Sequence, residues 1–212
     1  LILLIREFCA ENFTDIPRAV AAGAERIELC DNLAVGGTTP SYGVIKETAD
    51  YLKDTKTTFA SMIRPRGDNF VYNSIELRIM ESDILKAVEA GTSELVFGAL
   101  TDDNSLDLEA LETLMIASQG LPVTFHMAFD KIPTDHQKSA LDELVSLGFD
   151  KILMHGDCLD KPINTAKIAE LVSYAADRIQ ILAGGGVTAA NAETVSSETG
   201  SSYVHGTKIV TL

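Results

Sequence analysis

The chain has 212 residues, of which 46% are hydrophobic and 23% charged, and its 31 acidic and 17 basic side chains give a formal net charge of -14. This apolar content is enough for a buried core, which excludes a disordered chain and a small disulfide-stabilised protein. The acidic balance argues against nucleic acid or an anionic membrane surface as a partner, because both are bound through clustered lysines and arginines.

We expect the chain to be soluble and cytoplasmic. The first apolar run, residues 1–5, is too short for a membrane span or a signal-peptide core. The three cysteines, Cys9, Cys30 and Cys158, are odd in number and lack close CxxC spacing, which favours a reducing cytoplasm. No linker divides the sequence, so we expect a single domain over residues 1–212.

Short apolar segments along the chain predict eight β-strands. Four of them follow a glycine of the kind that ends a helix, and these lie in segments 22–29, 90–97, 147–154 and 199–205. The other four are Leu3–Cys9, Thr58–Ile63, Pro122–Phe125 and Gln180–Ala183. Each is short and rich in β-branched or large apolar residues, as buried parallel strands are.

Between these strands, apolar residues recur at spacings of three and four, which predicts helices with one buried face. The helical patterns lie at residues 44–52, 77–88, 108–115, 141–145 and 168–175. Asn73 with Glu76 resembles a capping box, and Asp107 and Thr188 are expected to be further N-caps.

This alternation predicts an α/β fold, a compact TIM (β/α)8-type barrel. Right-handed crossovers keep neighbouring strands parallel, and closure leaves no exposed sheet edge. Only seven residues follow His205, so we expect the eighth helix to be short or missing. An open doubly wound sheet is the alternative arrangement.

The first two predicted strands end in the same Glu-x-Cys pattern, Glu7 to Cys9 and Glu28 to Cys30. Side chains two apart on a strand share a face, and neighbouring strands bring the two cysteines near one another. A pair of thiolates suits Cu(I), which accepts soft ligands in small number. The alternative is that both cysteines are small buried hydrophobic residues.

Three histidines, His126, His155 and His205, come at or just after the ends of predicted strands. A histidine there can act as a general acid, a general base or a metal ligand, or it can be held by hydrogen bonds within a loop. His136 precedes a predicted helix and is expected at the surface.

Anion-binding groups are also expected at the strand ends. Arg64 and Arg66 follow the third strand, and they can bind a carboxylate or phosphate or can pair with Glu7 and Glu28 as structural ion pairs. Gly184, Gly185 and Gly186 follow the seventh strand, and His205 ends the eighth. These loops hold phosphate in many barrels, although a tight turn is the simpler interpretation of the glycines.

Several segments together resemble the copper homeostasis protein CutC family. They are Glu25–Cys30, Gly36–Gly43, Ile63–Gly67, Val123–His126 with Ala128–Asp130, and Gly184–Val187. The resemblance implies a TIM barrel, a cytoplasmic location, self-association into a dimer or larger homo-oligomer, and binding or trafficking of Cu(I). It also implies that Cys9 and Cys30 are the copper ligands. Met127, Asp68 and His155 depart from the family pattern.

Two functional hypotheses follow, and a catalytically idle barrel with a structural role is a third. In the first, Cys9 and Cys30 bind Cu(I) as the metal, and neighbouring side chains shape the pocket. In the second, the barrel is an enzyme for a small anionic substrate, such as a phosphorylated one. Its catalytic candidates are Glu7, Glu28, Arg64, His126 and Asp130, and its anion-binding candidates are Arg66, Gly184, Gly185, Gly186 and His205.

Overall fold

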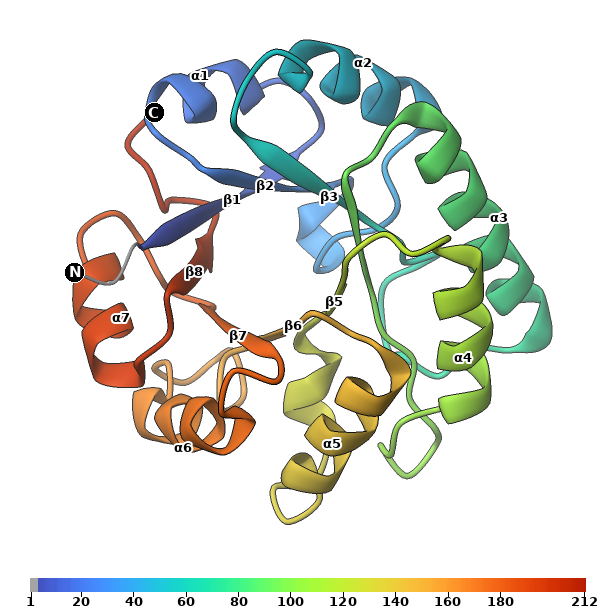
Figure 1. Cartoon of the computed structure of the whole chain (residues 1–212), viewed down its shortest axis with the longest axis vertical. Coiled ribbons are helices and arrows are strands. Elements are labelled where there is room, and N and C mark those ends of the chain that lie inside the picture. The colour runs from blue at the N-terminus through green and yellow to red at the C-terminus, as the bar shows by residue number, and fades with distance from the viewer. Residues whose placement is uncertain (1–3) are drawn as a thin grey trace.

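A computed structural model describes residues 4–212. Its eight strands are all parallel and close into a barrel in the order β1 to β8, with the helices outside (Figure 1). The strands are β1 (Ile5–Glu11), β2 (Arg26–Cys30), β3 (Thr58–Met62), β4 (Glu94–Phe97), β5 (Val123–Phe125), β6 (Lys151–Met154), β7 (Gln180–Gly184) and β8 (Tyr203–Gly206). The predicted closed barrel is confirmed and the open sheet is excluded. Leu3, the predicted start of the first strand, lies outside the described residues.

Seven α-helices connect successive strands. They are α1 (Ile16–Ala21), α2 (Tyr42–Leu52), α3 (Ser74–Ala90), α4 (Leu108–Ala117), α5 (Gln137–Leu147), α6 (Thr165–Ala175) and α7 (Ala192–Thr199), with short 3-10 helices η1 (Leu33–Val35) and η2 (Met127–Lys131). Within residues 4–212 no helix follows β8, as expected. None of the helices in this range has the length and apolar character needed to cross a membrane.

The N-terminal caps explain where two of these helices begin. Asn73 Oδ1 accepts hydrogen bonds from the amides of Ile75 and Glu76, while the Glu76 carboxylate accepts one from the Asn73 amide, so the predicted capping box is confirmed. Asp107 caps α4 as predicted. Thr188 does not cap a helix. It forms an isolated β-bridge with Lys208, and the N-cap of α7 is Asn191, three residues later.

Removing the α3 cap should cost about 1 kcal/mol. Asn73→Ala leaves the amides of Ile75 and Glu76 without their acceptor, so we expect the free energy of unfolding to fall by about 1 kcal/mol. The measurement is urea denaturation of the purified protein. The adjacent exposed Ser74→Ala serves as control and should change stability by less than about 0.5 kcal/mol. Equal effects of the two substitutions would contradict the capping role.

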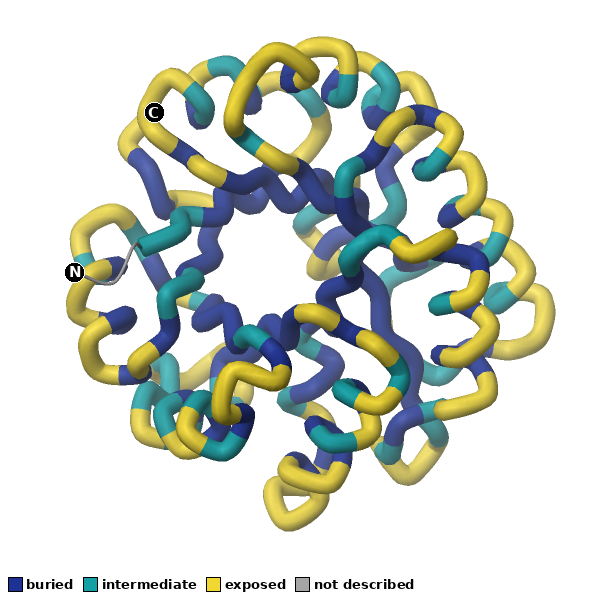
Figure 2. Tube along the Cα trace, viewed as in Figure 1, coloured by how far each residue is buried: buried dark blue, intermediate teal, exposed yellow. Residues whose placement is uncertain are grey.

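The apolar residues form two separate groups. The large core packs between the barrel wall and the helices, while a small cluster inside the barrel consists of Cys9, Cys30, Ala60, Met62 and Val96. Figure 2 shows the corresponding buried ring of strands inside a shell of half-exposed helices. Because side chains alternate along each strand, the barrel interior receives the positions between those that contact the helices.

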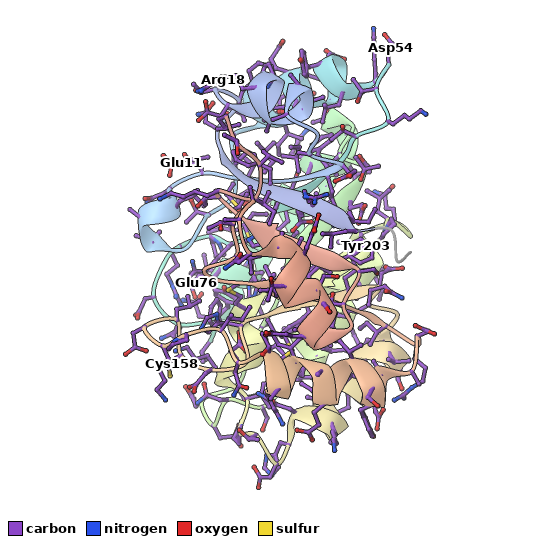
Figure 3. All side chains as sticks on the ribbon, turned by 90° about the vertical axis from the view of Figure 1, so that its left-hand side faces the viewer. Glu11, Arg18, Asp54, Glu76, Cys158 and Tyr203 are labelled. Carbon is purple, nitrogen blue, oxygen red and sulfur yellow. The ribbon has the colours of Figure 1, made fainter. Side chains whose placement is uncertain are left out.

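The carboxyl ends of the strands share one end of the barrel. Figure 3 shows Glu11, at the end of β1, and Cys158, after β6, on the same side of the molecule, opposite Tyr203 at the start of β8. The loops at this end carry the predicted site residues, as in other barrels of this type.

Candidate functional site

A cavity of about 500 Å³ lies at the carboxyl end of the barrel. Its lining includes Cys9, Glu28, Arg64, His126, Gly185 and His205, all of which are predicted site residues. These side chains come from strands or loops distributed around the barrel, and closure brings them to one opening.

The structure brings the two cysteines together around a carboxylate. Glu28 Oε2 lies 3.4 Å from the sulfur of Cys9 and 3.5 Å from the sulfur of Cys30. One ligand atom of each residue falls within 4.8 Å of the other two, and all three residues are buried. The strand register explains the arrangement, because Cys9 lies opposite Glu28 and Cys30 lies two residues further along β2. The second oxygen of Glu28 has no hydrogen-bond partner among the described residues.

The two sulfurs differ in protonation. A hydrogen bond from Cys30 and the neighbouring His205 lower the pKa of Cys9 to about 5 against the effect of burial. The pKa of Cys30 is raised well above its usual range, because Cys30 donates that hydrogen bond and is buried beside Glu28. At neutral pH the pair therefore holds one thiolate, on Cys9.

His205 connects the cysteine pair to a second carboxylate. Its Nδ1 lies 2.7 Å from Glu7 Oε1 and its Nε2 lies 3.7 Å from Glu28 Oε2. Burial opposes the charged ring, but Glu28 and the contacts with Cys9 and Glu7 raise its pKa well above the usual value. Burial raises the pKa of Glu28 to about 8. The anionic groups around it thus favour the charged form of His205, and the Glu28 carboxyl, with a pKa of about 8, can gain or lose a proton near neutral pH.

A chain of buried charges fills the barrel below the cysteines. Arg26 forms ion pairs with both Glu7 and Glu94, and Lys151 Nζ lies 2.9 Å from Glu94. Burial opposes the charge of Glu7, but Arg26 and His205 lower its pKa to about 2. Sequence reasoning missed Arg26, Glu94 and Lys151. The available signal was the position of Arg26 two residues before Glu28 on β2. Side chains two apart on a strand share a face, so Arg26 points into the barrel together with Glu28.

Arg64 does not pair with either predicted carboxylate. Glu7 is occupied by Arg26, and the Arg64 guanidinium instead donates to the backbone carbonyls of Val35, Gly37 and Asp68. The expected internal ion pair is therefore wrong, because the register of β1 and β2 places Arg26 beside Glu7. Arg64 is 4% exposed, and no carboxylate of the described chain lies within 4.0 Å of it.

His126 is a neutral ring at the cavity wall. Its Nδ1 accepts a hydrogen bond from the Ala128 amide, so the ring proton lies on Nε2. Burial and the nearby charge of Arg64 lower its pKa to about 3. The ring therefore stays uncharged at neutral pH and can donate a hydrogen bond from Nε2, but it is a poor proton acceptor.

Besides Glu7 and Cys30, three predicted site residues lie outside the cavity lining, namely Arg66, Asp130 and Gly184. Arg66 binds the Glu76 carboxylate, with Nε 2.5 Å from Oε1, and also donates to nearby backbone carbonyls. Asp130 accepts hydrogen bonds from the amides of His155 and Gly156, and burial raises its pKa to about 6. Gly184 ends β7 without lining the cavity.

Gly185 is required for packing at the cavity wall. Its φ is +82°, and a Cβ there would lie 2.5 Å from Nδ1 of His155. That ring is held by the carbonyls of Gly184, Gly185 and Lys161. The glycine run thus fixes a tight turn against His155, while Gly185 and Gly186 still present backbone to the cavity. Cys158 is exposed, and His136 lies at the surface as predicted.

Comparison with known proteins identifies relatives along the whole chain. The CutC family profile matches residues 4–210. A CutC family protein from Streptococcus pyogenes serotype M6 is 58% identical over 209 residues, which is 98% of this chain and 100% of the relative. The human copper homeostasis protein cutC homolog is 37% identical over 201 residues, which is 95% of this chain and 72% of the human protein.

Solved structures agree with the sequence comparison. A CutC crystal structure from Streptococcus agalactiae has a TM-score of 0.95 and 57% identity, covering 98% of this chain and 100% of that chain. A deoxyribose phosphate aldolase from Aeropyrum pernix has a TM-score of 0.72 at 12% identity, covering 98% of this chain and 86% of that chain, which shows a shared fold alone. The chain therefore belongs to the CutC family of copper homeostasis proteins.

Proposed function

We propose that the protein binds Cu(I) through the sulfurs of Cys9 and Cys30, at the carboxyl end of the barrel. The observation that carries this proposal is the buried cluster in which both sulfurs and a Glu28 oxygen lie within 4.8 Å of one another. Thiolates are soft ligands, and Cu(I) prefers them over the oxygen donors that bind Mg²⁺ or Ca²⁺. A reducing cytoplasm would keep both thiols available.

The donor set favours Cu(I) over zinc. Structural zinc sites hold four ligands in tetrahedral geometry. Among residues 4–212, the clusters of candidate ligands contain three residues each, one with Cys9, Glu28 and Cys30 and the other with Glu7, Glu28 and His205. Glu7 is already held by Arg26, so the second cluster has few free donors.

Removing both sulfurs should abolish tight Cu(I) binding. In a competition titration against a coloured Cu(I) chelator, carried out without oxygen, we expect Cys9→Ser with Cys30→Ser to weaken Cu(I) affinity by at least about 100-fold. The matched control is Cys158→Ser, because Cys158 is exposed and lies outside the cluster, and it should retain the affinity of the unmodified protein. Unchanged affinity in the double variant, or tighter binding of Zn²⁺ than of Cu(I), would refute the proposal.

Self-association stays a prediction of the family resemblance.

The cavity favours a second candidate function, an enzyme for a small anionic substrate. Metal binding by two cysteines does not require an opening of about 500 Å³. The cavity is also lined by groups that the copper proposal does not use, Arg64 and His126. In such an enzyme these two residues would bind the substrate, and Glu28 would transfer protons, since its carboxyl has the pKa of about 8 suited to that step.

A further inference from the structure

A methionine shares the interior of the barrel with the two cysteines. The chain has five methionines, all within the described residues, and Met62 is the one that belongs to the small cluster with Cys9, Cys30, Ala60 and Val96. Its thioether is a soft donor of the kind that Cu(I) accepts, whereas zinc sites are built from cysteine, histidine and carboxylate ligands. The cluster therefore contains three sulfurs and not two.

The strand register places Met62 next to Cys30. Glu28 on β2 pairs with Ala60 on β3, and Cys30 and Met62, the last residues of these two strands, each lie two residues further along. Neighbouring strands lie about 4.8 Å apart, and side chains two apart on a strand share a face. Because Glu28 and Cys30 both point into the barrel, Met62 points into it beside Cys30.

Met62 and Cys9 lie at the floor of the cavity. Both line it, with exposed fractions of 4% and 7%, whereas Cys30 is fully buried and does not line it. The backbone of Gly37 covers Cys30, because a Cβ at Gly37 would lie 3.2 Å from the Cys30 sulfur. An ion that enters through the cavity would meet Cys9 and Met62 first and reach Cys30 behind them.

The other donors near the cysteines suit Cu(I) less well. Glu28 offers a hard oxygen. Both ring nitrogens of His205 are turned toward carboxylates, with Nδ1 2.7 Å from Glu7 Oε1 and Nε2 3.7 Å from Glu28 Oε2. A thioether is neutral, so it adds no negative charge to a buried site that already contains two carboxylates. Met62 is thus the soft, uncharged donor beside the pair.

We propose that the Met62 thioether is a third sulfur ligand of Cu(I), which forms a three-coordinate site with Cys9 and Cys30. The inference rests on the proposed function, because it adds a ligand to the same site. It also gives Met62 a role in specificity, since a thioether strengthens the binding of Cu(I) and contributes little to the binding of zinc.

The first test is a competition titration with Cu(I), carried out without oxygen. Met62→Leu keeps the apolar bulk but removes the sulfur, so we expect Cu(I) affinity to fall about tenfold and Zn²⁺ affinity to stay unchanged. Met127→Leu is the matched control, because Met127 also lines the cavity but lies against Gly184 on β7, and it should bind Cu(I) as the unmodified protein does. Unchanged Cu(I) affinity in Met62→Leu, or an equal loss in both variants, would overturn the assignment.

The second test does not depend on a substitution. In protein produced with selenomethionine, X-ray absorption at the selenium edge reports atoms bound to the methionine side chains. Addition of Cu(I) should produce a selenium–copper distance in the unmodified protein and in Met127→Leu, and none in Met62→Leu. If the double variant Cys9→Ser with Cys30→Ser loses affinity but selenium detects no copper in the unmodified protein, the Met62 assignment alone fails. Unchanged affinity in that double variant rejects the cysteine site and the assignment with it.

Discussion

Replacing Arg26 with methionine is expected to lower the free energy of unfolding by about 3–5 kcal/mol. Arg26 is 3% exposed and pairs with Glu7 and Glu94 inside the barrel. Methionine has a similar length but no charge, so the substitution leaves Glu7 buried with His205 as its remaining charged partner. Glu94 keeps its contact with Lys151. The cost therefore comes mainly from the loss of the cation that two buried carboxylates share, and not from a lost packing contact.

Two further variants separate this cause from general disruption. Adding Glu7→Gln to Arg26→Met removes one of the two carboxylates that lost Arg26 and should recover part of the lost stability. Arg18→Met, at an exposed ion pair with Asp15, should lower the free energy of unfolding by less than about 1 kcal/mol. Chemical denaturation at pH 7 measures all four proteins. A loss below about 1 kcal/mol for Arg26→Met would show that the charge chain contributes little to stability.

His126 should make the protein sensitive to acid over a defined range. Its pKa is about 3 in the folded protein, against an ordinary value of 6.5, because the ring is buried beside Arg64. As the pH falls below 6.5, the unfolded chain takes up a proton at His126 while the folded protein does not. The free energy of unfolding is therefore unaffected by this residue at pH 7 and falls progressively toward pH 3. Between pH 7 and pH 4, the free energy of unfolding of the unmodified protein should fall by about 3 kcal/mol more than that of His126→Asn.

The comparison with His126→Asn isolates this effect from other groups. Asparagine retains an acceptor for the Ala128 amide but cannot be protonated. Asp130, with a pKa raised to about 6, titrates in the same range with the opposite sign, and it contributes equally to both proteins. Denaturation curves at several pH values give the difference directly. Parallel pH profiles for the two proteins would contradict the buried neutral ring, and His136→Asn, at the surface, should follow the unmodified protein.

The sequence by itself determined the order and kind of the elements. Strand segments and helical stripes are local patterns, and glycines such as Gly91 and Gly148 end helices by adopting positive φ. Eight predicted strands without a domain break favoured a closed barrel over an open sheet, and the structure has the closed barrel. The proximity of Cys9 and Cys30 was also predictable, because the two-residue period of a strand acts on both Glu-x-Cys patterns and the strands are neighbours.

Only the tertiary structure decided which charges meet. Arg26 forms the ion pair with Glu7 that was considered for Arg64, because the parallel register places Arg26 opposite Glu7 on β1 and β2. No local sequence pattern specifies this register. That exchange leaves Arg64 buried without a carboxylate, facing the cavity next to His126. The proton on His126 Nε2 likewise depends on one backbone amide in the following turn. Hydrogen-bond partners and burial are set by three-dimensional packing, and they decide the charge that each of these residues carries.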